Sequence, residues 1–98
     1  MPEAERDPLR IDLFLKKVCI EKSRSAAARL CEEGKIRVNG RLAKSSKDVR
    51  PEDEISVVLG PRELVFSIIA LPESNVSKAQ APSFYRILSV KRLPGAFE

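Results

Sequence analysis

The stretch Glu21–Leu30, EKSRSAAARL, gathers positive charge and hydrogen-bond donors at the start of a predicted helix. Ser23 is a favourable residue to cap that start, and the alanines after it favour a helix. Lys22 and Arg24 add charge to a helix end that already carries a partial positive charge, which is locally unfavourable. Free N–H groups at a helix start bind phosphate, so the sequence predicts an anion site at Lys22–Ser25.

Further basic residues accompany this site along the first half of the chain. Residues 10–50 hold twelve Lys and Arg against five Asp and Glu, and the whole chain has a net charge of +4. Such a block indicates a polyanionic partner, nucleic acid before membrane. Each side chain alone fits an ordinary solvated residue, but together they predict a contiguous phosphate-binding surface. Its expected members besides Lys22, Ser23, Arg24 and Ser25 are Arg10, Lys16, Lys17, Lys35, Arg37, Arg41, Lys44 and Lys47.

The chain offers little for catalysis or metal binding. It has no histidine and two cysteines, Cys19 and Cys31, which excludes His-based catalysis and mixed Cys/His zinc sites. Both cysteines fall on apolar faces of predicted helices, so we expect buried thiols instead of a disulfide or a nucleophile. Asp12, Asp48 and Asp53 are isolated acids, to which we assign structural roles at helix ends and turns. We expect a protein that is not an enzyme and needs no cofactor or metal.

Two helices must position the first of these basic residues. Apolar residues recur at helical spacing from Ile11 onward and predict a helix over Arg10–Cys19. A second helix is expected over Ser23–Glu33, ended by Gly34 at the position that favours glycine. The short connection between them makes a helix-turn-helix-like pair.

A period of two replaces the helical period after the second helix. Asn39-Gly40 predicts a hairpin, because a type I′ turn requires positive φ at both positions. Strands are expected around it in KIRVNGRLAK, and again in ISVVL and ELVFSIIA. We divide the chain into a loose tail (1–9), a domain (10–70), and a linker with a helical extension (71–98) that contains SFYRILSVKRL. The predicted class is α+β, with two N-terminal helices on a small, mostly antiparallel sheet and a short C-terminal helix.

The scarcity of aromatic and base-reading side chains indicates which kind of nucleic acid the chain binds. Four Phe, one Tyr and no Trp disfavour a stacking platform for single strands. The aromatic signature of RRM domains and the GxxG loop of KH domains are absent. The second helix offers mostly alanine instead of the Asn, Gln or Arg that read base edges. We therefore favour structured RNA, recognised through its backbone and shape, with a DNA-binding helix-turn-helix regulator as the alternative.

The segment Arg10–Val57 resembles an S4-type RNA-binding domain. The matching motifs are RID at its start, KSRSAA in the second predicted helix, GKIRVNG in the hairpin and PED in the next turn. The short chain resembles stand-alone, ribosome-associated members of that family, of the heat-shock and ribosome-quality-control types. The resemblance implies an S4-type (αL) fold, with RNA contacts at Arg10 and Arg24. Leu13 and Glu52 depart from the family pattern, in which Lys and Gly are usual.

The resemblance also implies a function. Proteins of this kind bind structured 23S rRNA and tRNA on the large (50S) ribosomal subunit, without catalysis, in rescue or quality control of stalled peptidyl-tRNA. A ribosome-assembly factor or a general binder of structured RNA is the alternative within the same class. The chain has no apolar run of membrane-spanning length and no signal peptide, so we expect a cytoplasmic protein with no membrane partner, acting as a monomer.

Overall fold

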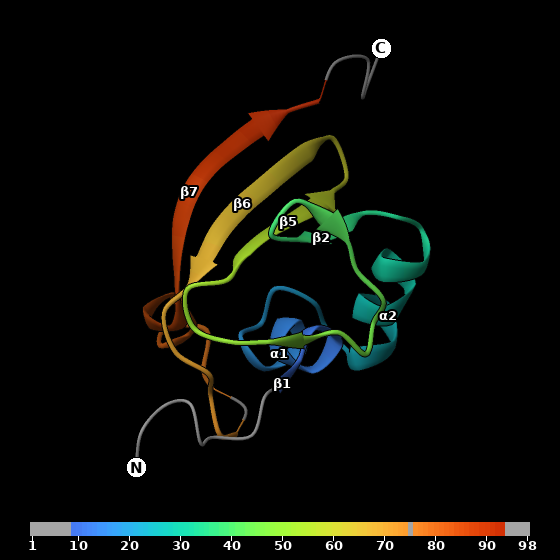
Figure 1. Ribbon diagram of the computed structural model, residues 1–98. Coiled ribbons are helices and arrows are strands. Elements are labelled where there is room, and N and C mark those ends of the chain that lie inside the picture. The colour runs from blue at the N-terminus through green and yellow to red at the C-terminus, as the bar shows by residue number, and fades with distance from the viewer. Residues whose placement is uncertain (1–8, 75, 94–98) are drawn as a thin grey trace.

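Two helices lie on one side of an antiparallel sheet in the computed structural model, which describes residues 9–74 and 76–93 (Figure 1). Five strands form that sheet in the order β3-β2-β5-β6-β7, and β1 pairs with β4 separately. The predicted α+β class, with two helices on a mostly antiparallel sheet, is confirmed. The elements are β1 (Leu9–Arg10), α1 (Ile11–Lys17), α2 (Arg24–Glu32), β2 (Ile36–Val38), β3 (Arg41–Leu42), β4 (Asp48–Val49), β5 (Glu54–Leu59), β6 (Arg62–Ile68), the 3-10 helix η2 (Ala81–Phe84) and β7 (Tyr85–Arg92).

The helix α1 is shorter than predicted because the chain turns sharply after Lys17. Cys19 adopts a left-handed backbone conformation with a φ of 64°. The N–H of Ile20 then bonds back to the carbonyl of Leu15 at 3.0 Å, which closes the turn. The turn carries Cys19 off the apolar face of the helix. The prediction of two buried cysteines is therefore wrong for Cys19, which is exposed, and right for Cys31, which is buried.

The helix α2 begins and ends as the sequence predicts. Ser23 is its N-cap residue, and the Ser23 Oγ accepts a hydrogen bond from the N–H of Ala26 at 3.1 Å. After the helix, Gly34 takes a φ of 75°, which glycine adopts without the strain that a side chain would bring. Ala27 and Cys31 are the buried residues of α2, so this helix presents a narrow apolar face to the core.

The hairpin between β2 and β3 is also confirmed. Asn39 and Gly40 have φ values of 52° and 86°, both positive as a type I′ turn requires. The Asn39 side chain accepts from the N–H of Glu54 at 2.9 Å and donates to Asp53 at 3.2 Å. Asp53 in turn accepts from the N–H of Arg50 at 2.9 Å. These bonds tie the hairpin to the start of β5 and give Asp53 the structural role predicted for it.

Aromatic residues in the core connect α1 to the strands β6 and β7. The ring centroids of Phe14 in α1 and Phe66 in β6 are 6.3 Å apart. Tyr85, at the start of β7, packs 5.0 Å from Phe66. Because Phe14 and Phe66 are fully buried, this contact series forms the centre of the core and links α1 to the last strand.

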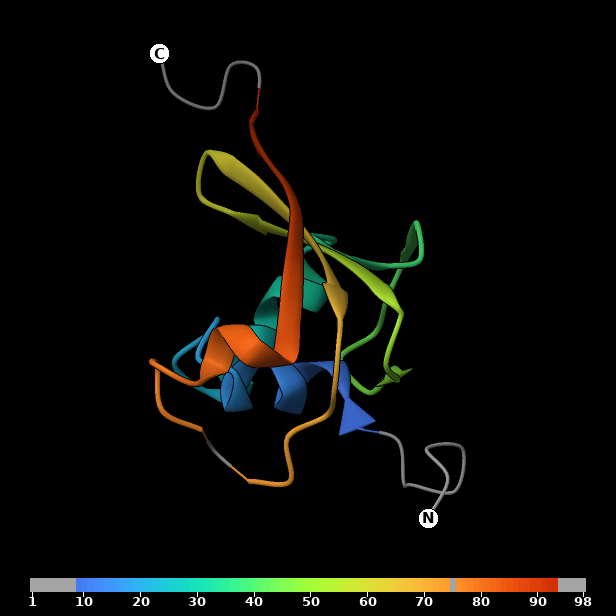
Figure 2. The same cartoon turned by 90° about the vertical axis from the view of Figure 1, so that its left-hand side faces the viewer.

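The segment SFYRILSVKRL does not form the predicted C-terminal helix. Ser83 and Phe84 belong to the short 3-10 helix η2, and Tyr85–Arg92 forms β7, which pairs along its length with β6 (Figure 2). Without β7, β6 would be an edge strand with unpaired backbone groups, and the Tyr, Ile and Val of this segment favour a strand. Ile87 and Leu88 of β7 are exposed.

The residues between β6 and η2, predicted to be a linker, pack against the domain. Leu71 and Ala81 are buried, and the chain between them passes beside α1 (Figure 2). The N–H of Val76 donates to the carbonyl of Lys17 at 3.3 Å. Residues 71–74 and 76–93 therefore add to the same core and the same sheet as the first half of the chain.

The predicted tail lies almost entirely outside the described residues. Its last member, Leu9, pairs with Val49 across β1 and β4. Within the part of the chain that the structure describes, no helix has the length and apolar character needed to cross a membrane.

Candidate nucleic-acid interface

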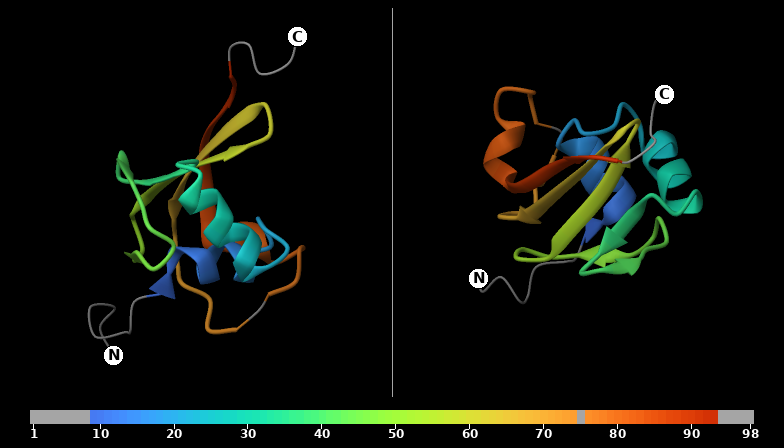
Figure 3. Two further views of the ribbon diagram at one scale, coloured as in Figure 1. Left: turned by 90° about the vertical axis from the view of Figure 1, so that its right-hand side faces the viewer. Right: turned by 90° about the horizontal axis from the view of Figure 1, so that it is seen from above.

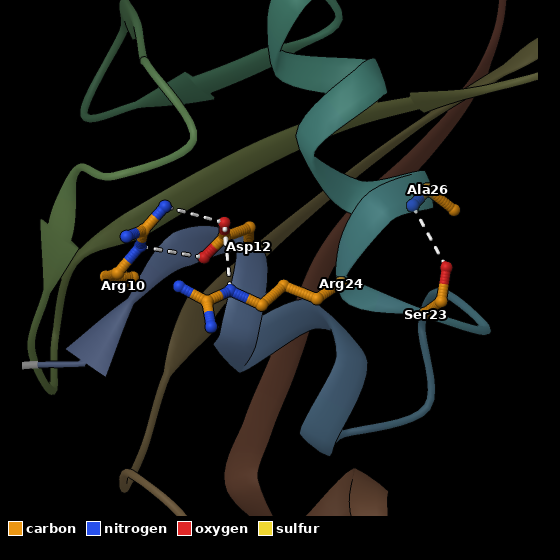
Figure 4. A network of polar contacts seen from close by, with 5 residues as sticks. All are labelled: Arg10, Asp12, Ser23, Arg24 and Ala26. Atoms are coloured by element: carbon orange, nitrogen blue, oxygen red, sulfur yellow. Dashed lines mark hydrogen bonds and ion pairs between the residues drawn. The ribbon is translucent and has the colours of Figure 1, made fainter.

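Arg10 and Arg24 converge on the carboxylate of Asp12 (Figure 4). Arg10 donates from Nε to Oδ1 at 3.2 Å and from Nη2 to Oδ2 at 3.0 Å. Arg24 donates from Nε to Oδ2 at 3.3 Å. The Asp12 side chain is 3% exposed, whereas those of Arg10 and Arg24 are 42% and 49% exposed. We call the two arginines, held by this buried carboxylate, the arginine pair.

The helix ends explain why these three residues meet. Arg10 is the N-cap residue of α1, and Asp12 lies in its first turn, where the partial positive charge of the helix start favours a carboxylate. The helices α1 and α2 pack against each other, so Arg24, the first residue of α2, reaches the same carboxylate (Figure 3). Because Ser23 caps α2, it also fixes where the helix begins and hence where Arg24 projects.

The arginine pair keeps positive charge and free donors at the surface. Two guanidinium groups share one carboxylate, so the cluster has a net positive charge. A guanidinium has five N–H donors, of which Arg10 gives two and Arg24 one to Asp12. The remaining donors have the planar fork that matches phosphate oxygens. Asp12 already restrains both side chains. On binding phosphate they would therefore lose less conformational entropy than unrestrained arginines would.

Three more predicted residues line one cavity together. Arg41, Lys44 and Lys47 line a cavity of about 510 Å³ beside the β2–β3 hairpin. The loop that carries Lys44 and Lys47 is fixed to the start of α1, because the N–H of Ile11 donates to the carbonyl of Lys47 at 2.8 Å. This backbone contact joins the loop to the start of α1, the helix end at which Arg10 lies.

The start of α2, where the sequence predicts an anion site, has backbone N–H groups outside the helical hydrogen bonds. Its Ser23 hydroxyl is engaged as the helix cap, through the Oγ that accepts from Ala26. The first intrahelical bond runs from the N–H of Ala27 to the carbonyl of Ser23, so the N–H groups of Arg24 and Ser25 precede the helical ladder. An anion at this end would meet those two N–H groups.

Two predicted residues do not join this surface. Lys35 pairs with Glu33, with its Nζ 3.1 Å from Oε1. Arg37 projects from the face of β2 opposite to the buried Ile36 and Val38, and its guanidinium donates to the carbonyl of Gly40 at 3.3 Å. The contiguous surface predicted from the sequence is therefore smaller than expected, because β2 turns Arg37 away from the side on which the helices lie.

Three predicted lysines lie together at the other end of α1. Lys16, Lys17 and Lys22 line a cavity of about 710 Å³, which Lys78 also lines. We call this space the lysine cavity. Nothing in the sequence singles out Lys78, since it lies in a polar stretch far from the other lysines. Its position depends on the contacts of Glu73 and Val76 with Lys17 of α1.

Asp12 has the structural role at a helix end that the sequence predicts, but it is not isolated, because it accepts hydrogen bonds from both Arg10 and Arg24. Its spacing from Arg10 indicates a local pair, but the contact with Arg24 depends on helix packing. The same carboxylate affects Cys31 in α2. Burial raises the pKa of the Cys31 thiol to about 11, with smaller contributions from the negative charges of Asp12 and Glu32. This thiol stays protonated at neutral pH and is a poor nucleophile.

Known proteins share both the sequence and the fold of this chain. The S4 domain family matches residues 9–55. The structure of heat shock protein 15 from Vibrio cholerae, described as trimeric, superposes with a TM-score of 0.80 at 29% identity, over 85% of this chain and 84% of that one. The S4 fold expected from the motifs is therefore confirmed.

Two bacterial proteins match along nearly their whole length. The RQC P-site tRNA stabilizing factor of Streptococcus pneumoniae is 34% identical over 85 residues, which cover 87% of this chain and 96% of that protein. The protein of the same name from Bacillus subtilis is also 34% identical, over 87% of this chain and 98% of that one. The chain thus belongs to the S4-domain family of RQC P-site tRNA stabilizing factors.

Proposed function

We propose that this protein binds structured RNA on the large ribosomal subunit, contacting 23S rRNA and tRNA, and that it stabilises stalled peptidyl-tRNA complexes in rescue or quality control. The observation that carries the proposal is the arginine pair, in which two half-exposed guanidinium groups are held by the buried Asp12. The names of the relatives, which are P-site tRNA stabilizing factors, support tRNA as a partner of this chain.

The side chains around the arginine pair favour recognition of the RNA backbone over recognition of bases. The residues of α2 beside Arg24 are Ser25 and three alanines, which offer no bidentate partner for a base edge. All four aromatic side chains of the described residues are buried or half-buried, so stacking on unpaired bases is disfavoured. Phosphate contacts carry no sequence information but fix the register and orientation of the bound nucleic acid. A factor that holds tRNA of any sequence needs contacts of this kind.

The proposed role requires no catalysis by this chain. The buried Cys31 thiol is protonated at neutral pH, because burial raises its pKa to about 11. Asp12 is engaged by two arginines, which makes it a positioning group. We propose that the protein works in the cytoplasm as a non-catalytic monomer that holds RNA. Analytical ultracentrifugation of the free protein measures its mass. A trimer, as described for the Vibrio cholerae relative, would contradict the proposed monomeric state.

Sedimentation with ribosomal particles tests the function. The purified protein is mixed with 30S, 50S and 70S particles, and with 50S particles that carry peptidyl-tRNA, at several salt concentrations. We expect co-sedimentation with tRNA-loaded 50S particles that weakens as salt rises, because phosphate contacts release counterions. Binding to bare 50S particles alone would favour an assembly factor. A preference for duplex DNA at matched salt would favour the helix-turn-helix alternative.

A charge-matched control separates the arginine pair from a general effect of positive charge. Arg24→Ala and Arg62→Ala each remove one positive charge, and Arg62 lies at the far end of the sheet, where β6 begins. We expect Arg24→Ala to lose affinity for the loaded particles and Arg62→Ala to keep it. Equal losses would mean that net charge, and not the arginine pair, determines binding.

A further inference from the structure

The lysine cavity combines residues from two distant parts of the chain. Lys16 and Lys17 come from the last turn of α1, and Lys22 from the connection to α2. Lys78 comes from the segment after β6. The cavity has a volume of about 710 Å³, within the range of about 300–1,000 Å³ found for small-molecule sites. It is therefore large enough for a nucleotide-sized group.

Backbone and side-chain contacts hold the segment after β6 against α1. The N–H of Val76 donates to the carbonyl of Lys17 at 3.3 Å. In return, the Nζ of Lys17 donates to the carbonyl of Glu73 at 3.2 Å. The thiol of Cys19 donates to the carbonyl of Val76 at 3.4 Å. These three contacts place Lys78, two residues beyond Val76, at the wall of the cavity.

The charge in the cavity is strongly positive. Glu21 is the one acidic residue that lines it, against four lysines. The bond from Lys17 to a backbone carbonyl leaves its ammonium charge uncompensated. Among the described residues, neither Lys22 nor Lys78 forms an ion pair. The negative end of α1 favours Lys16 and Lys17 near its last turn, but it does not account for Lys22 and Lys78, which lie outside that helix.

We propose that the lysine cavity binds phosphates of the RNA backbone, as a second contact that the segment after β6 completes. This inference rests on the proposed function, since it assumes that RNA is the ligand. Lysine ammonium groups act as point charges for phosphate and do not select a base. The helix α1 rises about 1.5 Å per residue, so Arg10 and Lys17 lie on the order of 10 Å apart along its axis. An RNA backbone that meets the arginine pair therefore needs to extend only a short way to reach the cavity.

The protein contains its own reporter for this cavity. Cys19 is exposed and lines it, whereas Cys31 is buried and has a pKa raised by burial to about 11. In the native protein, iodoacetamide should therefore alkylate Cys19 and leave Cys31 unmodified. The rate of Cys19 alkylation is measured by mass spectrometry, with and without saturating deacylated tRNA. We expect tRNA to slow this reaction at least about fivefold.

The alkylation result separates this inference from the proposed function. If tRNA binds, as shown by sedimentation of the same mixture, but Cys19 reacts at an unchanged rate, the cavity stays open and this inference is wrong while the proposed function stands. If neither tRNA nor ribosomal RNA binds at all, the proposed function fails and the inference fails with it.

Variants of Lys78 test whether the charge, and not simple shielding by nearby RNA, produces the protection. Lys78→Ala should weaken tRNA binding about threefold to tenfold and reduce the slope of log K against log salt by about one. Lys78→Arg should keep both values near wild type. Lys91→Ala removes the same charge from the exposed β7 and should leave affinity unchanged. An affinity of Lys78→Ala equal to that of Lys91→Ala would overturn the role of Lys78.

Discussion

The arginine pair and the lysine cavity both present positive charge, but the protein fixes them by different means. Arg10 and Arg24 are oriented by three hydrogen bonds to one buried carboxylate. Of the cavity lysines, Lys17 is held by a neutral backbone carbonyl. A planar, restrained guanidinium recognises phosphate at a defined angle, whereas an ammonium on a flexible stem attracts phosphate from many directions. The first region is suited to set the register of RNA, and the second to add affinity once the RNA is placed.

The two regions also differ in how much hydration their charged groups lose when the protein folds. A carboxylate as buried as that of Asp12 loses its hydration on folding, and this loss is offset only if its oxygens find good partners. Both oxygens do so, through the two arginines. The exposed Lys22 and Lys78 of the cavity keep access to water and lose little hydration on folding, so they add little to folding stability. Mutations should therefore affect stability at the arginine pair and leave it nearly unchanged at Lys22 and Lys78.

The largest effect is expected from Asp12→Asn. An amide has nearly the shape of the carboxylate but no charge, and one of its two positions becomes an N–H₂ that faces a guanidinium. We expect the free energy of unfolding to fall by about 1.5–3 kcal/mol, the range for a hydrogen bond to a charged group. RNA affinity should fall at least about tenfold, because both arginines lose their orientation. Urea denaturation and tRNA binding measure the two effects.

A surface acid provides the control for Asp12. Glu33→Gln removes a carboxylate whose pair with Lys35 is nearly half exposed, so it should change stability by less than about 1 kcal/mol and leave affinity unchanged. If Asp12→Asn lowers stability but binds tRNA like wild type, Asp12 supports the fold alone and the arginines reach RNA without its help.

Arg24 should show a smaller effect on stability and a clear effect on binding. In Arg24→Ala, Asp12 keeps both hydrogen bonds from Arg10, and Arg24 is about half exposed. We therefore expect a stability loss below about 1 kcal/mol and a loss of affinity of about tenfold, as for one charge-assisted hydrogen bond. Arg24→Lys keeps the charge but not the planar fork, so it should restore only part of the affinity. Equal affinity for Lys and Arg would mean that Arg24 acts as a point charge, like the cavity lysines.

Local sequence patterns predict α2 and the β2–β3 hairpin well. The Ser23 cap, the glycine after α2 and the Asn39-Gly40 turn each depend on a few neighbouring residues, and the structure has all three. The predicted length of α1 and the predicted C-terminal helix, which is the strand β7 in the structure, are wrong for the opposite reason. A left-handed residue at Cys19 ends α1 early, and the open edge of β6 turns a helix-like spacing into a strand. Neither cause is visible in a short window of sequence.

The difference between local patterns and tertiary packing also explains which residues of the candidate site the sequence predicts and which it does not. Arg10, Lys22 and Arg24 stand out because they lie at predicted helix starts. Asp12 looked isolated because its bond to Arg24 spans twelve residues and requires the two helices to pack. Lys78 lies more than fifty residues from Lys22, and its place at the cavity depends on the contact between Val76 and Lys17. Charge composition identifies a basic region, but tertiary packing decides which charges act together.

The smallest expected effect on RNA affinity comes from substitutions of Ser23. They test whether phosphate binds at the start of α2 itself. Ser23→Ala removes the cap on Ala26 and should lower the free energy of unfolding by about 1 kcal/mol. Affinity for tRNA should change little in this variant, because the Ser23 Oγ already serves the helix. Ser23→Asp keeps a good cap, and its negative charge suits the helix start. It should therefore fold as stably as wild type, as urea denaturation would measure.

The negative charge in Ser23→Asp would also stand where the phosphate is expected. If RNA approaches the N–H groups of Arg24 and Ser25, this variant should weaken tRNA binding severalfold through repulsion while its stability is unchanged. Unchanged binding in Ser23→Asp would mean that the start of α2 serves to place Arg24 and does not itself contact RNA. That result would leave the arginine pair as the directional contact and would confine the remaining phosphate contacts to side chains, as in the lysine cavity.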